Sequence, residues 1–85
     1  MYLEIVTPSK KVFEGEVNIV TFPGTDGSFQ VMNDHAPMVS SLAEGKLVYK
    51  DKAGTHNVMI TGGVMEVLRN KIVVLADGLS EPVKE

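Results

Sequence analysis

Short runs of alternating hydrophobic and polar residues fill most of this chain, and clusters of Gly, Pro, Asn and Asp separate them. An alternation with a period of two is typical of a β-strand with one buried face, and no long segment shows the 3.6-residue period of an amphipathic helix. The predicted strands recur about every eight to twelve residues, a spacing typical of a β-sandwich or a flattened barrel. They cover residues 3–6, 12–16, 17–22, 28–31, 38–42, 46–50, 55–61, 64–68 and 72–76.

The run from Val17 to Phe22 is rich in β-branched residues and predicts one of these strands. Successive side chains of a strand point to opposite faces, so we expect Val20 and Phe22 to share one face. The opposite face takes the alternate residues of the run, Val17, Ile19 and Thr21.

Ile72 to Ala76 is the most continuous apolar run in the chain. Such runs are typical of strands covered on both faces, so it predicts a central, fully covered strand. Just before it, Arg69-Asn70 predicts a two-residue turn, because Asn accepts a positive φ. Gly62-Gly63 indicates a bulge or a close backbone approach, because a strand-like segment and not a phosphate-binding helix N-terminus follows it.

Composition excludes several classes of function. The chain of 85 residues has no Cys and two His, which excludes disulfides and thiolate metal sites and makes a zinc site built from its own residues difficult. Its formal net charge of −3, with eight Lys and Arg residues scattered among eleven Asp and Glu residues, argues against nucleic acid as a partner. No apolar run approaches the ~18 residues of a membrane span, and the first residues lack a secretory signal pattern. We expect one soluble domain without a cofactor or a metal.

The stretch from Pro23 to Pro37 contains two turns and the strand between them. Asp26-Gly27 favours a turn, because Gly reaches positive φ without steric cost. Asn33-Asp34-His35-Ala36-Pro37 cannot continue a strand ladder and predicts an exposed loop of specific shape. His35 is the obvious candidate for acid–base chemistry, but no nucleophile accompanies it, and the adjacent Asp34 of an extended chain points the other way. The sequence therefore assigns no catalytic residue.

Lys52 and Glu66 each have two interpretations. The tripeptide Asp51-Lys52-Ala53 lies on a predicted hairpin near mid-chain and resembles the hairpin that carries the modified lysine in lipoyl carrier domains. A lipoyl-type carrier domain modified on Lys52 is therefore the alternative function. The characteristic Gly-Asp turns of those domains are missing, which favours a plain solvated hairpin. Glu66 lies between apolar residues of a predicted strand. We expect it at the surface, because a covered Glu66 would need a partner such as Arg69 or Lys71.

One ordered set of short motifs resembles a known family. The motifs are Gly24-x-x-Gly27-x-Phe29-x-Val31, His35-Ala36-Pro37, Gly45, Gly62-Gly63-Val64-x-Glu66-Val67 and Val74-Leu75-Ala76-Asp77. Each is weak alone, but their order and spacing, without evident gaps between Phe13 and Pro37, are specific. From about Leu3 to Asp77 the chain is similar to the N-terminal domain of the epsilon subunit of bacterial and chloroplast F-type ATP synthase, called delta in mitochondria.

The resemblance implies an all-β fold over residues 1–78, a β-sandwich of two antiparallel sheets with no substantial helix. A polar tail follows over residues 79–85, which we expect to fray. The resemblance also implies a non-catalytic subunit of the central stalk, the rotor of the synthase. Such a subunit binds the gamma subunit and the ring of membrane c subunits, and couples ion translocation to ATP synthesis. It is peripheral at the cytoplasmic face of the inner (plasma) membrane and reaches the membrane only through the c-ring.

By position, the resemblance implies an interface with gamma and the c-ring in loops at one end of the sandwich. The implied interface residues are Asp26, Gly27, Ser28, Met32, Asn33, Asp34, His35 and Met38. Asn33-Asp34 stands where the family commonly has Pro-Gly, and Ser28 stands where an acid is frequent, which leaves Asp26 to pair with a basic ring loop. Family members continue into a two-helix hairpin that carries inhibition of ATP hydrolysis. The sequence ends at Glu85 without it, so we expect a naturally short version or a truncated form.

Overall fold

All nine predicted strands form in the computed structural model, which describes residues 1–80. Most boundaries differ slightly from the prediction, because a strand continues as far as its backbone finds a pairing partner. The strands are β1 (Tyr2–Val6), β2 (Lys11–Glu16), β3 (Ile19–Gly24), β4 (Gly27–Met32), β5 (Met38–Leu42), β6 (Gly45–Asp51), β7 (Gly54–Ile60), β8 (Gly63–Leu68) and β9 (Lys71–Ala76). No helix occurs within residues 1–80, which confirms the all-β prediction.

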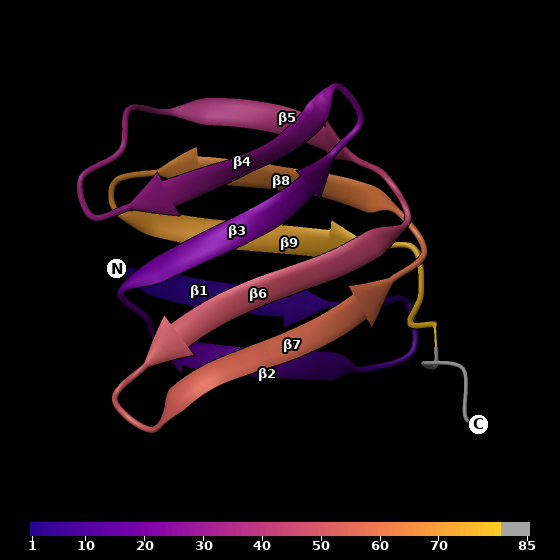
Figure 1. Ribbon diagram of the computed structural model, residues 1–85, viewed down its shortest axis with the longest axis horizontal. Coiled ribbons are helices and arrows are strands. Elements are labelled where there is room, and N and C mark those ends of the chain that lie inside the picture. Colours follow the sequence, from indigo (N-terminus) through magenta and orange to yellow (C-terminus); the bar gives the residue numbers. More distant parts are fainter. Residues whose placement is uncertain (81–85) are drawn as a thin grey trace.

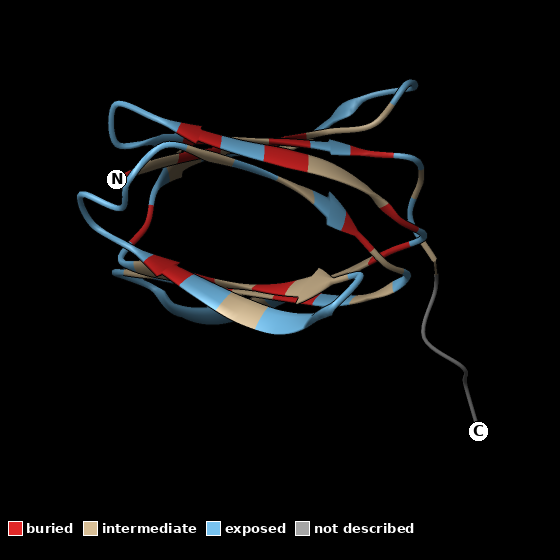
Figure 2. Ribbon diagram, turned by 90° about the horizontal axis from the view of Figure 1, so that it is seen from above, coloured by how far each residue is buried: buried red, intermediate tan, exposed pale blue. Residues whose placement is uncertain are grey.

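The strands pack as two layers, as a β-sandwich requires (Figures 1 and 2). One layer has the order β2-β1-β9-β8-β5, and the other has β4-β3-β6-β7. A single backbone pair, Gly24 with Leu42, joins β3 to β5 where the layers meet. The strand pairs are antiparallel except β1 with β9, which run parallel. No short turn connects these two strands, so the chain connectivity does not impose the antiparallel direction on them.

The core lies between the two layers and is built from alternate residues of the strands. Val20 and Phe22 are fully buried, as predicted. Val17 is also buried, which contradicts its predicted place on the opposite face. The chain crosses from β2 to β3 at residues 17 and 18, and this crossing resets the alternation. The buried residues are Met1, Leu3, Ile5, Val17, Val20, Phe22, Val31, Leu42, Leu47, Tyr49, Ile60, Met65, Val67, Ile72, Val74 and Ala76.

Strand β9 has the predicted central place, between β1 and β8. Its Ile72 and Val74 are fully buried, but Val73 is only half-buried and Leu75 is 51% exposed. The prediction that both faces of this strand are covered is therefore wrong within residues 1–80. The reason is that these residues form only two layers, and each layer has one face toward the core and one face toward solvent.

Gly62 lies between β7 and β8 and Gly63 begins β8, and their φ angles of 131° and 149° are in the region that favours glycine. Gly63 lies directly against β9. A Cβ atom at Gly63 would meet the carbonyl oxygen of Leu75 and would lie 2.9 Å from the Cα of Ala76. The predicted close backbone approach is thus confirmed.

The first residues of the expected polar tail are paired with β7. Leu79 forms an isolated antiparallel bridge with Ile60, and the N–H of Ser80 donates to the carbonyl oxygen of Met59 at 3.0 Å. The expectation of a frayed tail is therefore wrong at Leu79 and Ser80, because the free edge of β7 offers backbone partners. Residues 81–85 of that tail lie outside the described residues.

Candidate partner-binding surface

The first predicted interface segment is the turn between β3 and β4. Gly24 and Gly27 pair across the two strands, so Thr25 and Asp26 form a two-residue turn. Gly27 has a φ of 120°, which explains why the sequence needs glycine there. Asp26, Gly27 and Ser28 are all exposed.

The second predicted segment is the loop between β4 and β5, residues 33–37. Asp34 has a φ of 62°, and its N–H donates to Oδ1 of Asn70 at 2.9 Å. Nδ1 of His35 lies 2.7 Å from the carbonyl oxygen of Ala36, and because a carbonyl only accepts, this ring nitrogen carries the proton. Asn70 lies in the predicted turn with Arg69, where both residues have positive φ. The loop is therefore held in one shape by the neighbouring turn, a role of Asn70 that the sequence did not indicate.

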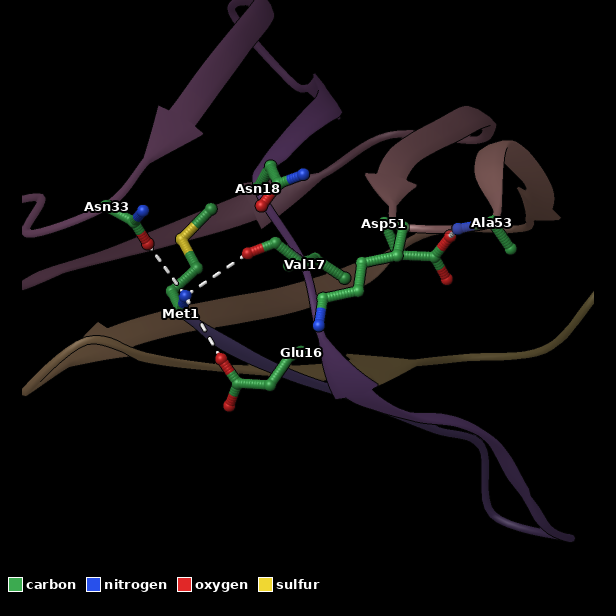
Figure 3. A pocket seen from close by; sticks show the side chains of 8 residues that line it. Met1, Glu16, Val17, Asn18, Asn33, Asp51 and Ala53 are labelled. Carbon is green, nitrogen blue, oxygen red and sulfur yellow. Dashed lines mark hydrogen bonds and ion pairs between the residues drawn. The ribbon is translucent and has the colours of Figure 1, made fainter.

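Asn33 is held by the N-terminus in a pocket of about 620 Å³ at this end of the sandwich (Figure 3). The α-amine of Met1 donates to Oδ1 of Asn33 at 2.7 Å and to the carbonyl oxygen of Val17 at 3.2 Å. It also lies 3.5 Å from a carboxylate oxygen of Glu16. The side-chain oxygen of Asn33 is thus occupied within the chain, which fixes the start of the loop.

The two predicted segments lie at opposite ends of β4 (Figure 1). This strand has six residues, which separates the turn from the loop by roughly 20 Å at the usual rise of a strand. One end holds the exposed residues Met32, Asn33, Asp34 and His35 and the half-buried Met38. The other end holds Asp26, Gly27 and Ser28. The expectation of a single docking end is therefore wrong, because β4 is fully extended between the two turns.

An exposed apolar surface adjoins the loop end, on the outer face of β5, β8 and β9. Val39 is 68% exposed and Leu75 is 51% exposed, although both are aliphatic. A shallow pocket of about 240 Å³ lies among them. We call this surface the apolar face, and it comprises Val39, Val64, Leu68, Val73 and Leu75 around Glu66. Glu66 is exposed, as predicted.

The apolar face is not among the predicted interface residues, although the sequence contains a signal for it. In residues 64–68 and 72–76 both sets of alternate positions contain apolar residues. One set fills the core, so the other must be apolar on the outside of the layer. An apolar outer face of this kind commonly marks a surface that a partner covers.

The remaining part of the same outer face, on β1 and β2, is charged. Lys11 Nζ lies 2.7 Å from Glu14 and 3.5 Å from Glu4, and Lys71 Nζ lies 3.8 Å from Glu4. The hydrogen bond between Lys11 and Glu14 lowers the pKa of the Glu14 carboxyl and raises the pKa of the Lys11 amine. The hydrogen bond between Tyr2 and Glu14 raises the pKa of the Tyr2 hydroxyl. This part is a solvated ion network of the ordinary surface kind.

The remaining titratable side chains within residues 1–80 lie in pairs or alone. No group of three His, Cys, Asp and Glu side chains is close enough there to hold a metal. His56 Nε2 donates to Asp51 at 2.9 Å, and this bond is the main cause that lowers the pKa of the Asp51 carboxyl. Lys52 is exposed at the tip of the β6–β7 hairpin. No helix among these residues is long and apolar enough to cross a membrane.

Replacement of Asp34 with glycine is expected to stabilise the fold. A non-glycine residue at a φ of 62° is strained, and removal of the side chain should raise the free energy of unfolding by about 1 kcal/mol. Urea unfolding measures the change. Asp26→Gly is the matched control, since Asp26 is an exposed turn residue without a positive φ. An equal or smaller gain for Asp34→Gly than for Asp26→Gly would contradict the expected strain.

The chain is similar in sequence to a known protein family. The profile described as "ATP synthase, Delta/Epsilon chain, beta-sandwich domain" matches residues 1–82. The ATP synthase epsilon chain of Nitratidesulfovibrio vulgaris strain DP4 is 47% identical over 77 residues, which cover 91% of this chain and 58% of that protein. The epsilon chain of Maridesulfovibrio salexigens is 40% identical over 84 residues, which cover 99% of this chain and 59% of that protein.

A solved structure agrees at the level of the fold. A chain in the cryo-EM structure of the Tetrahymena thermophila mitochondrial ATP synthase central stalk and c-ring matches with a TM-score of 0.77 at 20% identity, over 94% of this chain and 65% of that one. The chain spans less than three fifths of the length of the N. vulgaris relative. Because the family profile and both relatives cover nearly all of it, the chain belongs to the delta/epsilon family of ATP synthase chains and forms the β-sandwich domain of that family.

Proposed function

We propose that this chain is a non-catalytic part of the rotor of an F-type ATP synthase at the cytoplasmic face of the membrane. It binds the gamma subunit and the c-ring and couples ion translocation to ATP synthesis. Family membership supports this proposal, because the relatives are ATP synthase epsilon chains. The family profile covers the whole described chain, which favours the rotor function over a lipoyl carrier modified on Lys52.

The observation that carries the proposed gamma interface is the apolar face next to the loop of residues 33–37. Val39, the second residue after that loop, lies on the face, and Leu68 precedes the turn that holds the loop. Isolated domains rarely expose a continuous aliphatic surface, and interfaces commonly combine an apolar centre with a polar rim. Gamma would cover the apolar face as the centre, and His35 and Asp34 would lie at the rim.

The c-ring would then contact the opposite end, at the Asp26 turn. That turn presents one carboxylate and two small residues, Gly27 and Ser28, on a short hairpin. Such a turn suits a flat contact with polar loops, in which Asp26 pairs with a basic side chain of the ring. Between the two ends lies a close-packed core, which has low compressibility and so transmits a torque without large deformation.

Binding measurements with purified partners test the proposal. Titration of this chain with gamma should give a one-to-one complex, and the isolated chain should hydrolyse no ATP. The Asp26→Lys variant should keep its affinity for gamma but assemble poorly with complexes that contain the c-ring. Lys52→Ala should change neither, because Lys52 lines the pocket of Asn33 but lies outside the apolar face and the Asp26 turn. A wild-type chain that does not associate with gamma at micromolar concentration would refute the proposal.

A further inference from the structure

Glu66 is a single carboxylate surrounded by aliphatic side chains. Across the sheet its paired neighbours are Val39 on β5 and Val73 on β9. Along β8 the next residues on the same face are Val64 and Leu68, because the residues between them are buried. Glu66 therefore lies at the centre of the apolar face and not at its margin.

Glu66 has no ion-pair partner within residues 1–80. The nearest candidate by register is Lys71 on β9, but its Nζ lies 3.8 Å from Glu4 and 5.7 Å above the ring of Tyr2. Neither Lys71 nor Arg69 forms an ion pair with Glu66 among the described residues, although both were possible partners by sequence. In the free chain the missing ion pair does not destabilise the fold, because water solvates the exposed Glu66 carboxylate.

A partner that covers the apolar face removes that water. An ionised carboxylate in an apolar contact is strongly unfavourable unless a cation or several donors replace its hydration. A purely apolar partner surface would therefore lose affinity at Glu66. A second copy of this chain would also bind weakly, because a two-fold contact through this face places the Glu66 carboxylates of both copies in the same apolar contact.

We propose that the gamma surface that covers the apolar face carries a Lys or Arg side chain opposite Glu66, and that this ion pair selects gamma over other apolar surfaces. The proposal rests on the proposed function. It adds the chemistry of the partner: an aliphatic surface with one central cation. Val39 and Leu75 would contribute most of the buried apolar area, and Glu66 would fix the register of the two surfaces.

Matched variants test the pair in titrations against gamma. Glu66→Gln keeps the size of the side chain and removes the charge, and it should weaken binding by about 30-fold, in the range found for buried charge pairs. Glu66→Lys should weaken it by more than about 100-fold through repulsion of the cation. Glu14→Gln is the control, because Glu14 is an exposed carboxylate on the same layer, on the edge strand β2. It should bind gamma as the wild type does. Both Glu66 variants should unfold at the wild-type temperature, since Glu66 makes no ion pair within residues 1–80.

Charge reversal in gamma identifies the partner residue. Single Lys→Glu and Arg→Glu variants of gamma are combined with Glu66→Lys, and one of them should restore binding. If wild-type chain binds gamma but both Glu66 variants bind equally well, or if no gamma variant restores binding, the ion pair is refuted and the rotor function stands. If the wild type does not bind gamma, the rotor function fails first. A free chain that sediments as a dimer and dissociates on Glu66→Lys would show that a second copy covers the face, which overturns the proposal.

Discussion

Replacement of Val39 with aspartate is expected to weaken the binding of gamma by at least about 100-fold, because it places a second carboxylate at the most exposed point of the apolar face. Val39 is 68% exposed in the described chain, so the substitution should leave the fold intact. Isothermal titration with gamma measures the affinity, and thermal unfolding checks the fold. Leu75→Asp should act in the same way, since Leu75 lies on the same face.

The control for this prediction is Val48→Asp. Val48 lies on β6, in the other layer, where its side chain alternates with the buried Leu47 and Tyr49 and so faces outward. It is a valine on an outer face that the proposed interface does not include. If Val39→Asp and Val48→Asp reduce the affinity equally, gamma does not bind through the apolar face.

Replacement of Gly63 with alanine should lower the free energy of unfolding by about 3 kcal/mol, which is large for a single methyl group. Two effects add at this position. The φ of 149° disfavours any side chain, and the new Cβ would meet the backbone of β9 at Leu75 and at Ala76, 2.9 Å away at its Cα. Backbone atoms cannot move aside as a flexible side chain can, so β8 and β9 would have to separate. Urea unfolding measures the loss.

Gly54→Ala separates these two effects. Gly54 has a comparable φ of 129°, but a Cβ there would have no heavy atom within 4 Å. That variant should therefore show only the backbone strain, about 1 kcal/mol. Equal losses at Gly54 and Gly63 would mean that the contact with β9 contributes nothing.

The strands and tight turns were predictable from sequence because they depend on neighbouring residues. Asp26-Gly27 and Arg69-Asn70 carry the conformational preferences of their turns, and Phe22 follows the alternation of its own strand. Val17 was wrongly placed because the change of layer at residues 17 and 18 is a tertiary event, without a local signal in a run of β-branched residues.

The candidate surface was only partly predictable for a similar reason. The residues of the turn and the loop follow from motifs, but their separation depends on β4 being extended between them. The apolar face combines residues from β5, β8 and β9, which are distant in sequence and meet only through strand pairing. Both sets of alternate positions in β9 contain apolar residues. This pattern is expected both for a strand whose second face is covered by a third layer of the same chain and for a strand whose second face binds another protein.

The parallel pairing of β1 with β9 has a consequence for the order of folding. Tyr2 pairs with Lys71 and Val6 with Leu75, so the first strand gains its inner neighbour only when the last described strand has been synthesised. Until then β1 and β2 can form only an isolated hairpin, which is marginal in water. Closure of so long a loop is entropically costly, and domains with such non-local pairing fold in milliseconds to seconds. Until residues 71–76 have been synthesised, the Leu3 and Ile5 side chains would stay uncovered, so completion of this layer would be a late step of folding.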